Sequence, residues 1–145
     1  MDKYYLEFLD ELVYSLRKYD DSKWSDWMYK SSLAFRQRAE LNYFFSAFGG
    51  AGSFNDNYFS GITTELANIA YKIASSLRDN RQDDIMSIIA AEQKRCINVC
   101  NMKYSTDNDN ECLNYINYLI NNYNLGNLHD ITEEYRNNKC IKSMK

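Results

Sequence analysis

Apolar residues recur along most of the chain at spacings of three and four, which is the repeat of one face of an α-helix. The clearest stripes lie within residues 3–18, 62–77 and 85–100. The first of them consists of Tyr5, Leu6, Leu9, Leu12, Val13 and Leu16. No alternation of apolar and polar residues is strong enough to indicate a strand. The pattern therefore predicts an all-α protein.

Two more helices are predicted between the first stripe and residue 49. Trp24 and Trp27 share one face of a helix, and two indole rings at this spacing are typical packing anchors. The strongly apolar residues 41–48 predict a further helix that ends at Gly49. Because its aromatic residues fall on adjacent positions, we expect that helix to be buried on several sides and central to the first half.

The second half of the chain is predicted to add shorter helices. Apolar residues over 113–120 indicate one, and the segment 130–136 indicates a last short helix, followed by a frayed tail over 136–145. The chain contains no proline, so helices need not be broken. We expect a single helical domain over residues 1–145, folded as one compact bundle of about six or seven helices.

One stretch, residues 48–56, interrupts the helical pattern with the sequence Phe-Gly-Gly-Ala-Gly-Ser-Phe-Asn-Asp. It holds three of the five glycines, and glycine tolerates the positive φ of a sharp turn. Ser53 and Asp56 have the spacing of a helix capping box, so we expect them to start the next helix. A phosphate-binding loop is the alternative, but the Lys-Ser/Thr ending is missing. The residues of this signature are Gly49, Gly50, Gly52, Ser53, Phe54, Asn55 and Asp56.

Charge narrows the classes of partner. The formal net charge is −3, with 20 acidic against 17 basic residues, which argues against a nucleic-acid-binding surface. No run of 18 apolar residues indicates a membrane span, and the N-terminus lacks the pattern of a secretory signal. We expect a cytoplasmic protein that binds neither nucleic acid nor membrane.

Two groups of residues could carry chemistry. His129, the only histidine, stands beside Asp130 and could form an acid–base pair, but no nucleophile accompanies it, so a surface residue is favoured. Four cysteines could form a zinc site, yet the tight C-x-x-C spacing is missing and reduced core thiols are favoured. We expect no catalytic residue, no metal and no cofactor. The cysteines are Cys96, Cys100, Cys112 and Cys140.

Acidic residues gather in three predicted turns. Acids at helix starts complement the helix dipole, which explains several of them singly. Together they could form an acidic surface that meets a basic partner, and we take them as the candidate partner-binding residues. They are Asp20, Asp21, Asp79, Asp83, Asp84, Asp107, Asp109 and Glu111.

Residues 24–27, Trp-Ser-Asp-Trp, followed by the stretch 48–56, resemble a family of small bacterial helical proteins. Its members have a tryptophan-bearing helix and then a G-G-M-G-S-F-N-D stretch. The resemblance covers about the first half of the chain, and Ala51 stands where the family has methionine. Proteins of this size and kind are similar to immunity proteins encoded beside contact-delivered or polymorphic toxins.

The resemblance implies a protein that acts by binding and is not an enzyme. We expect an immunity protein that occludes the active site of a cognate toxin domain, itself expected to be a basic nuclease. An acidic inhibitor suits a nuclease with a basic substrate channel, because opposite electrostatic potentials speed the association of the two proteins. The alternative is a cytoplasmic helical adaptor or regulator that binds another bacterial protein. A third interpretation, an enzyme centred on His129 or on a cysteine metal site, lacks the necessary constellation.

Overall fold

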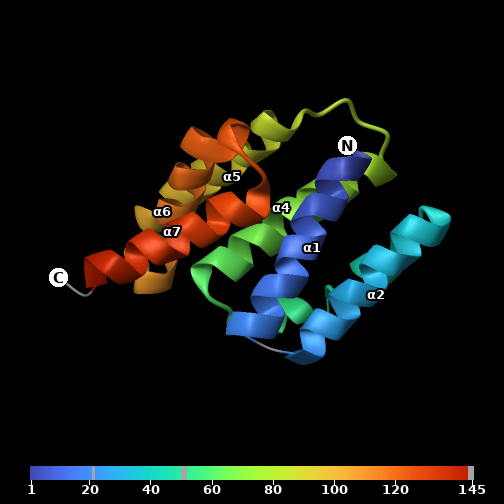
Figure 1. Cartoon of the computed structure of the whole chain (residues 1–145), viewed down its shortest axis with the longest axis horizontal. Helices are drawn as coiled ribbons and strands as arrows, with labels where there is room; N and C mark the ends of the chain where they lie inside the picture. The colour runs from blue at the N-terminus through green and yellow to red at the C-terminus, as the bar shows by residue number, and fades with distance from the viewer. Residues whose placement is uncertain (21, 50–51, 144–145) are drawn as a thin grey trace.

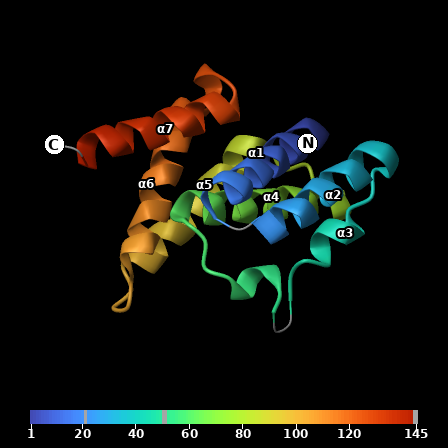
Figure 2. The ribbon, with the colours of Figure 1, turned by 60° about the horizontal axis from the view of Figure 1, so that its bottom comes forward.

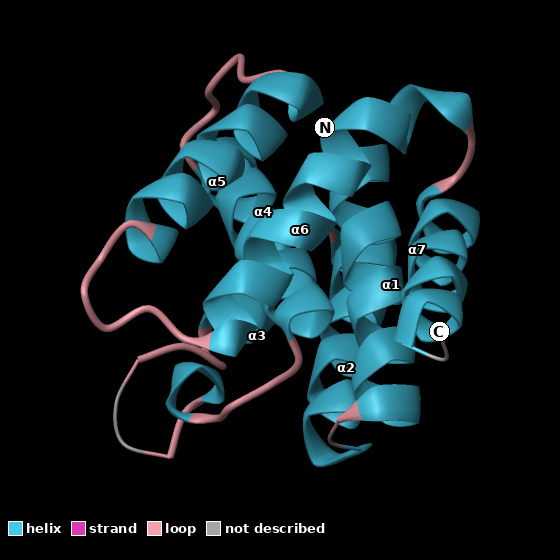
Figure 3. Ribbon diagram, turned by 90° about the vertical axis from the view of Figure 1, so that its left-hand side faces the viewer, coloured by secondary structure: helices cyan, strands magenta, loops and turns pink. Residues whose placement is uncertain are grey.

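A computed structural model describes residues 1–20, 22–49 and 52–143. These residues form seven α-helices and two short 3-10 helices, and none of them lies in a strand (Figures 1 and 3). The prediction of an all-α protein with six or seven helices is confirmed. The α-helices are α1 Asp2–Tyr19, α2 Ser22–Arg38, α3 Asn42–Phe45, α4 Gly61–Arg78, α5 Ile85–Cys100, α6 Asp107–Asn122 and α7 Leu128–Ser143. The 3-10 helices are η1 Phe54–Asp56 and η2 Tyr123–Leu125.

The helix at the centre of the fold is α4. It packs against α1 on one side and against α5 and α6 on the other. Outside this group, α2 lies along α1, and α7 crosses over α6 and reaches α1 (Figures 1 and 2). The first and last helices of the chain therefore meet.

The sequence pattern explains why α1 and α4 fill the core. The stripe predicted on α1 is buried, and its side chains pack on the predicted stripe of α4. Burying such side chains stabilises the fold by roughly 1.5–3 kcal/mol each. The side chains with no exposed surface on these two helices include Tyr5, Phe8, Leu9, Leu12, Leu16, Leu66, Ile69 and Ile73.

Two predicted elements differ from the structure. The helix expected over 41–48 is only the four-residue α3, although Phe44 is fully buried as expected. Its aromatic rings reach the core from a short turn followed by a loop, so burial there does not need a long helix. At the other end, the backbone of α7 is helical as far as Ser143, and the frayed tail predicted from residue 136 is wrong over this range.

A close approach between helices fixes the start of α4. At Gly61 the backbone of α4 lies against α6, and a Cβ atom added there would come within 2.9 Å of the backbone nitrogen of Cys112. It would also meet the side chain of Glu111. Only a residue without a side chain allows this packing, so Gly61 sets the distance between α4 and α6.

Candidate functional site

The glycine stretch forms a loop between α3 and α4 that is closed by its own side chains. Gly49 and Gly52 have φ values of 92° and 76°, a region that favours glycine. The backbone N–H of Gly49 donates to Asn55 Oδ1 at 3.2 Å, and that of Gly52 donates to Asp56 Oδ2 at 2.7 Å. The side chains of Asn55 and Asp56 therefore stabilise the turns at the two glycines. Gly50 and Ala51 lie outside the described residues.

The capping box predicted from Ser53 and Asp56 does not form. The Ser53 hydroxyl donates to Asn55 Oδ1 at 2.9 Å and makes no capping bond, while the Asp56 carboxylate is taken by Gly52. Only the short helix η1 follows directly. The long helix α4 starts later, where Ser60 Oγ accepts from the backbone N–H of Thr63 at 3.4 Å.

Phe54 attaches this loop to the bundle. Its side chain is buried, and its ring stacks on Phe59 with centroids 4.7 Å apart. It also meets the edge of Trp24 at 5.4 Å and Phe48 at 5.3 Å. Its backbone N–H donates to Ala47 O at 2.8 Å. The expected packing role of Trp24 is confirmed, because this indole is buried against the loop.

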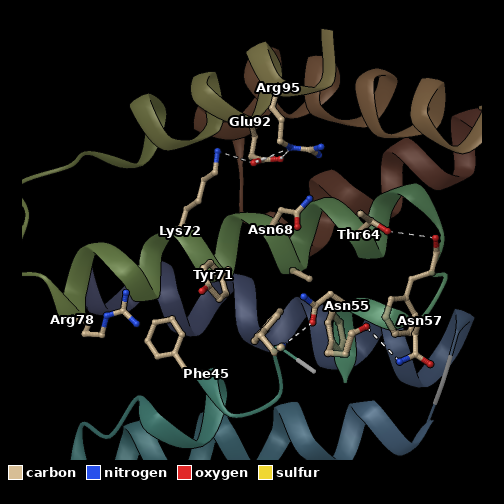
Figure 4. A pocket seen from close by; sticks show the side chains of 15 residues that line it. Phe45, Asn55, Asn57, Thr64, Asn68, Tyr71, Lys72, Arg78, Glu92 and Arg95 are labelled. Atoms are coloured by element: carbon tan, nitrogen blue, oxygen red, sulfur yellow. Dashed lines mark hydrogen bonds and ion pairs between the residues drawn. The ribbon is translucent and has the colours of Figure 1, made fainter. Parts of the chain in front are cut away.

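A groove of about 800 Å³ opens between this loop, α4 and α5 (Figure 4). Tyr71 on α4 packs on Phe48 and Phe45, with ring centroids 4.9 and 5.3 Å apart. The groove thus has an aromatic floor, to which the loop and α4 add amide and hydroxyl groups. The aromatic lining residues are Phe45, Phe48, Phe54, Phe59 and Tyr71, and the neutral polar ones are Asn55, Asn57, Thr64 and Asn68.

One edge of the groove is charged, and its cations are paired with acids. Lys72 Nζ lies 2.7 Å from Glu92 Oε1. The guanidinium group of Arg95 bridges Glu92 at 3.1 Å and Glu65 at 2.9 Å (Figure 4 shows the Glu92 side). Further along, Arg78 pairs with an adjacent aspartate and lies over the Phe45 ring. The groove is therefore apolar and amide-lined rather than a site for a free anion.

Two buried carboxyl groups lie beneath this edge, and each affects the pKa of the other. Glu65 has no exposed surface and Glu92 has 1%. Burial, together with the hydrogen bond and charge of Glu92, raises the pKa of Glu65 to about 8. Burial opposes ionisation of Glu92 too, but hydrogen bonds from Glu65 and Lys72 and the charge of Arg95 lower its pKa overall. At neutral pH Glu65 is the protonated member of the pair.

The free energy of unfolding is expected to fall as pH rises from about 4.5 to about 8. Across this window the folded state holds the Glu65 proton and the unfolded chain releases it, so alkalinity favours unfolding. The steepest slope approaches about 1.4 kcal/mol per pH unit. Urea unfolding at several pH values measures it, and Glu65→Gln should flatten the curve. Glu134→Gln, at an exposed site, is the control, and an unchanged slope in Glu65→Gln would contradict the assignment.

Among the described residues, no group of possible metal ligands contains more than one cysteine. Cys96 and Cys112 are buried free thiols, as predicted, and burial raises the pKa of Cys96 to about 12. Cys100 lies partly exposed, and its thiol donates to the Asp109 carbonyl at 3.3 Å. The side chain of Cys140 lies outside the described residues.

The predicted acidic clusters occupy opposite ends of α4, a helix about 27 Å long. At its start, Asp20 accepts from the Ser60 backbone N–H at 2.8 Å. Close by, Asn108 in the first turn of α6 donates to the Phe59 carbonyl at 3.4 Å. At its end lie Asp79, Asp83 and Asp84. They therefore do not form one continuous surface. Asp21 lies outside the described residues.

Most of these acids have structural partners. Asp79 and Asp83 pair with Arg81 at 2.9 and 3.0 Å, and Asp84 caps α5 by accepting from the Ser87 backbone N–H. The remaining acids lie in the first turns of α6. There Asp109 completes a capping box with the preceding threonine, Asp107 is exposed, and Glu111 is partly buried beside the start of α4.

His129 does not pair with Asp130, as the sequence had suggested it could. Asp130 accepts from the side chain of Asn127 at 2.9 Å instead. The ring of His129 meets the edge of Tyr14, and its Nδ1 lies 2.8 Å from Oε2 of Glu11 on α1. The histidine therefore belongs to a contact between the first and last helices.

Sequence reasoning missed the buried acids Glu65 and Glu92. A signal was present, because Glu65 stands three residues after Ile62 and four before Ile69, on the apolar stripe of α4. Glu92 lies four residues after Ile88 on the stripe of α5. A carboxylate on the buried face of a helix requires a partner, and such positions mark candidate sites.

Comparison with known proteins gives one similarity. Residues 17–67 match a domain of unknown function, DUF6966, so the match covers 51 of the 145 residues. The matched segment runs from the end of α1 through α2, α3 and the glycine stretch into α4. No curated protein and no solved structure matches the chain. Among the described helices, none has both the length and the apolar character needed to cross a membrane.

Proposed function

We propose that this protein is a non-catalytic inhibitor, an immunity protein that binds a cognate toxin domain and occludes its active site. The observation that carries the proposal is the groove beside α4, with its aromatic floor and paired cations. Aromatic and arginine side chains are enriched in protein interfaces, where a few of them dominate the binding energy. A groove of this volume accommodates one or two inserted side chains of a partner.

The chemistry of the groove favours a neutral, apolar segment of the partner. Lys72 and Arg95 already face Glu92, so they offer little to an incoming anion. Asn68 on α4 lines the groove, and no other described residue hydrogen-bonds to its side chain. Its amide is free to bond to the backbone of an inserted loop.

The acidic residues near the two ends of α4 have a separate role in this proposal. A net charge of −3 and exposed acids such as Asp107 attract a basic nuclease domain over a distance. Rim charges of this kind act mainly on the rate of association. Complex formation should then slow with added salt, because screening shortens the reach of the charges.

Asn68→Arg is expected to weaken the complex at least about tenfold, because it places a bulky charge inside the groove. The probe is the protein domain encoded by the neighbouring gene, which this proposal expects to be the toxin, and binding kinetics at two salt concentrations are the measurement. Asn98→Arg, on the exposed face of α5, adds the same charge outside the groove and should leave the dissociation rate unchanged.

Two results would count against the proposal. Failure of the neighbouring toxin domain to form a complex would remove the immunity function and favour the adaptor alternative. A complex equally tight in Asn68→Arg and Asn98→Arg would keep the immunity function but exclude the groove as its contact surface.

A further inference from the structure

A second cluster of ionisable groups lies away from the groove, where α1 meets α7. It consists of Glu11 on α1 and of His129 and Glu133 on α7. One donor atom from each residue lies within 4.8 Å of the other two. His129 and Glu133 are four residues apart and so share one face of their helix. Glu11 approaches that face from the opposite side, with its Oε2 atom 2.8 Å from His129 Nδ1.

The Glu11 carboxylate is incompletely satisfied. Its side chain is 5% exposed, and its Oε1 atom is buried without a hydrogen-bond partner among the described residues. The Nη1 atom of Arg136 lies 3.9 Å from Oε1, beyond hydrogen-bond distance. A buried carboxylate oxygen without a partner is destabilising, since it has lost its water.

The guanidinium group of Arg136 bonds to residues other than Glu11. Its Nη1 atom donates to Glu133 Oε1 at 2.7 Å, and its Nη2 atom donates to Ser15 Oγ at 2.6 Å. Its guanidinium group also lies 4.0 Å from the centre of the Tyr19 ring. These contacts occupy one oxygen of Glu133 and leave its second oxygen available.

We infer that Glu11, His129 and Glu133 bind one divalent transition-metal ion of the zinc class. One imidazole nitrogen and two carboxylate oxygens form a ligand set that Zn²⁺ uses in proteins. Neighbouring ligands of a tetrahedral zinc ion lie about 3.3 Å apart, given bonds of about 2.0 Å. The 2.8 Å separation of Nδ1 and Oε2 needs to open only slightly. The inference departs from the expectation of no metal.

The cluster is open to solvent, which can deliver the ion and supply a water molecule as its fourth ligand. The His129 side chain is 47% exposed, so solvent reaches the cluster and water completes the coordination. The other candidate cluster, Glu65 with Glu92 and Cys96, is fully buried. Its carboxylates are already bonded to Lys72 and Arg95, which a metal ion would have to displace.

A metal ion at this place joins the two ends of the fold. Glu11 belongs to the first helix and the other two ligands to the last, so the ion cross-links helices that are distant in sequence. Binding to the folded state alone raises the apparent stability in proportion to the logarithm of the metal concentration. The melting temperature should therefore rise when zinc is added and fall when a chelator removes it.

The test is titration of the metal-free full-length protein with ZnCl₂ by calorimetry, and with CoCl₂ by visible absorption. We expect one ion per chain and a cobalt spectrum without the charge-transfer band of a thiolate ligand, since no cysteine takes part. His129→Ala and Glu133→Gln should each weaken binding at least about 100-fold, because even loss of a residue that merely orients a ligand costs roughly 10- to 100-fold. Glu134→Gln, at the adjacent exposed position, should bind like the unmodified protein.

Three results would overturn the inference. They are no saturable binding, a cobalt–thiolate band, or equal affinity in His129→Ala and Glu134→Gln. Circular dichroism in the presence of a chelator shows whether each variant is folded before its affinity is compared. Should His129→Ala fail to fold, Glu133→Gln decides alone, because it retains an oxygen for Arg136.

Discussion

Replacing Phe54 by alanine is expected to lower the free energy of unfolding by about 3–5 kcal/mol, which is typical of a buried phenylalanine. The ring packs between Trp24, Phe48 and Phe59, and it is one of the buried contacts that join the glycine stretch to the bundle. Its loss leaves a cavity that the neighbouring rings fill only partly. Urea unfolding followed by tryptophan fluorescence measures the change, since Trp24 is in contact with the deleted ring.

Tyr58→Ala is the matched control for Phe54→Ala. Tyr58 lies in the same loop but is fully exposed, so its removal should change stability by less than about 0.5 kcal/mol. Similar losses in the two variants would show that the loop is held by its length or its backbone bonds and not by Phe54.

Gly61→Val is expected to cost about 3 kcal/mol or more, and Gly61→Ala about 1–3 kcal/mol. The obstacle is the backbone of α6 at Cys112, which cannot rotate away as a flexible side chain can. A Cβ atom at this position forces α4 and α6 apart and disturbs the packing of both with α5. Thermal or urea unfolding measures the loss.

Gly126→Ala is the control for the glycine variants. A Cβ atom at Gly126 would meet only Ile131, at an ordinary 3.9 Å. Its φ of 180° is extended backbone that any residue adopts, so this variant should be nearly neutral. Equal stability of Gly61→Ala and Gly126→Ala would mean that α4 and α6 do not approach as closely as described.

The helices were predictable because their stripes follow a strictly local rule. Leu9, Leu12 and Leu16 lie on one face of α1 whatever α1 packs against. The same rule overestimated residues 41–48, since aromatic residues are equally apolar in a helix and in a turn that inserts them into the core. Phe44 is buried from a helix of only four residues.

The groove and the contact at Glu11 depend on how separate helices pack together. Tyr71 and Arg95 line one groove because α4 and α5 pack together. The spacing of residues within either helix does not predict this packing. His129 meets Glu11 across 118 positions of the chain. The capping box predicted from the Ser53–Asp56 spacing fails for a local reason. The Ser53 side chain hydrogen-bonds to Asn55 and the Asp56 side chain to Gly52, so neither caps a helix.

The proton held by Glu65 also changes the charge of the folded molecule. Counting residues gives −3 at pH 7, which assigns a full negative charge to every glutamate. With Glu65 protonated, the native state carries close to one negative charge fewer than this count. Through this group, folding raises the isoelectric point and takes up a proton from the solvent near neutral pH.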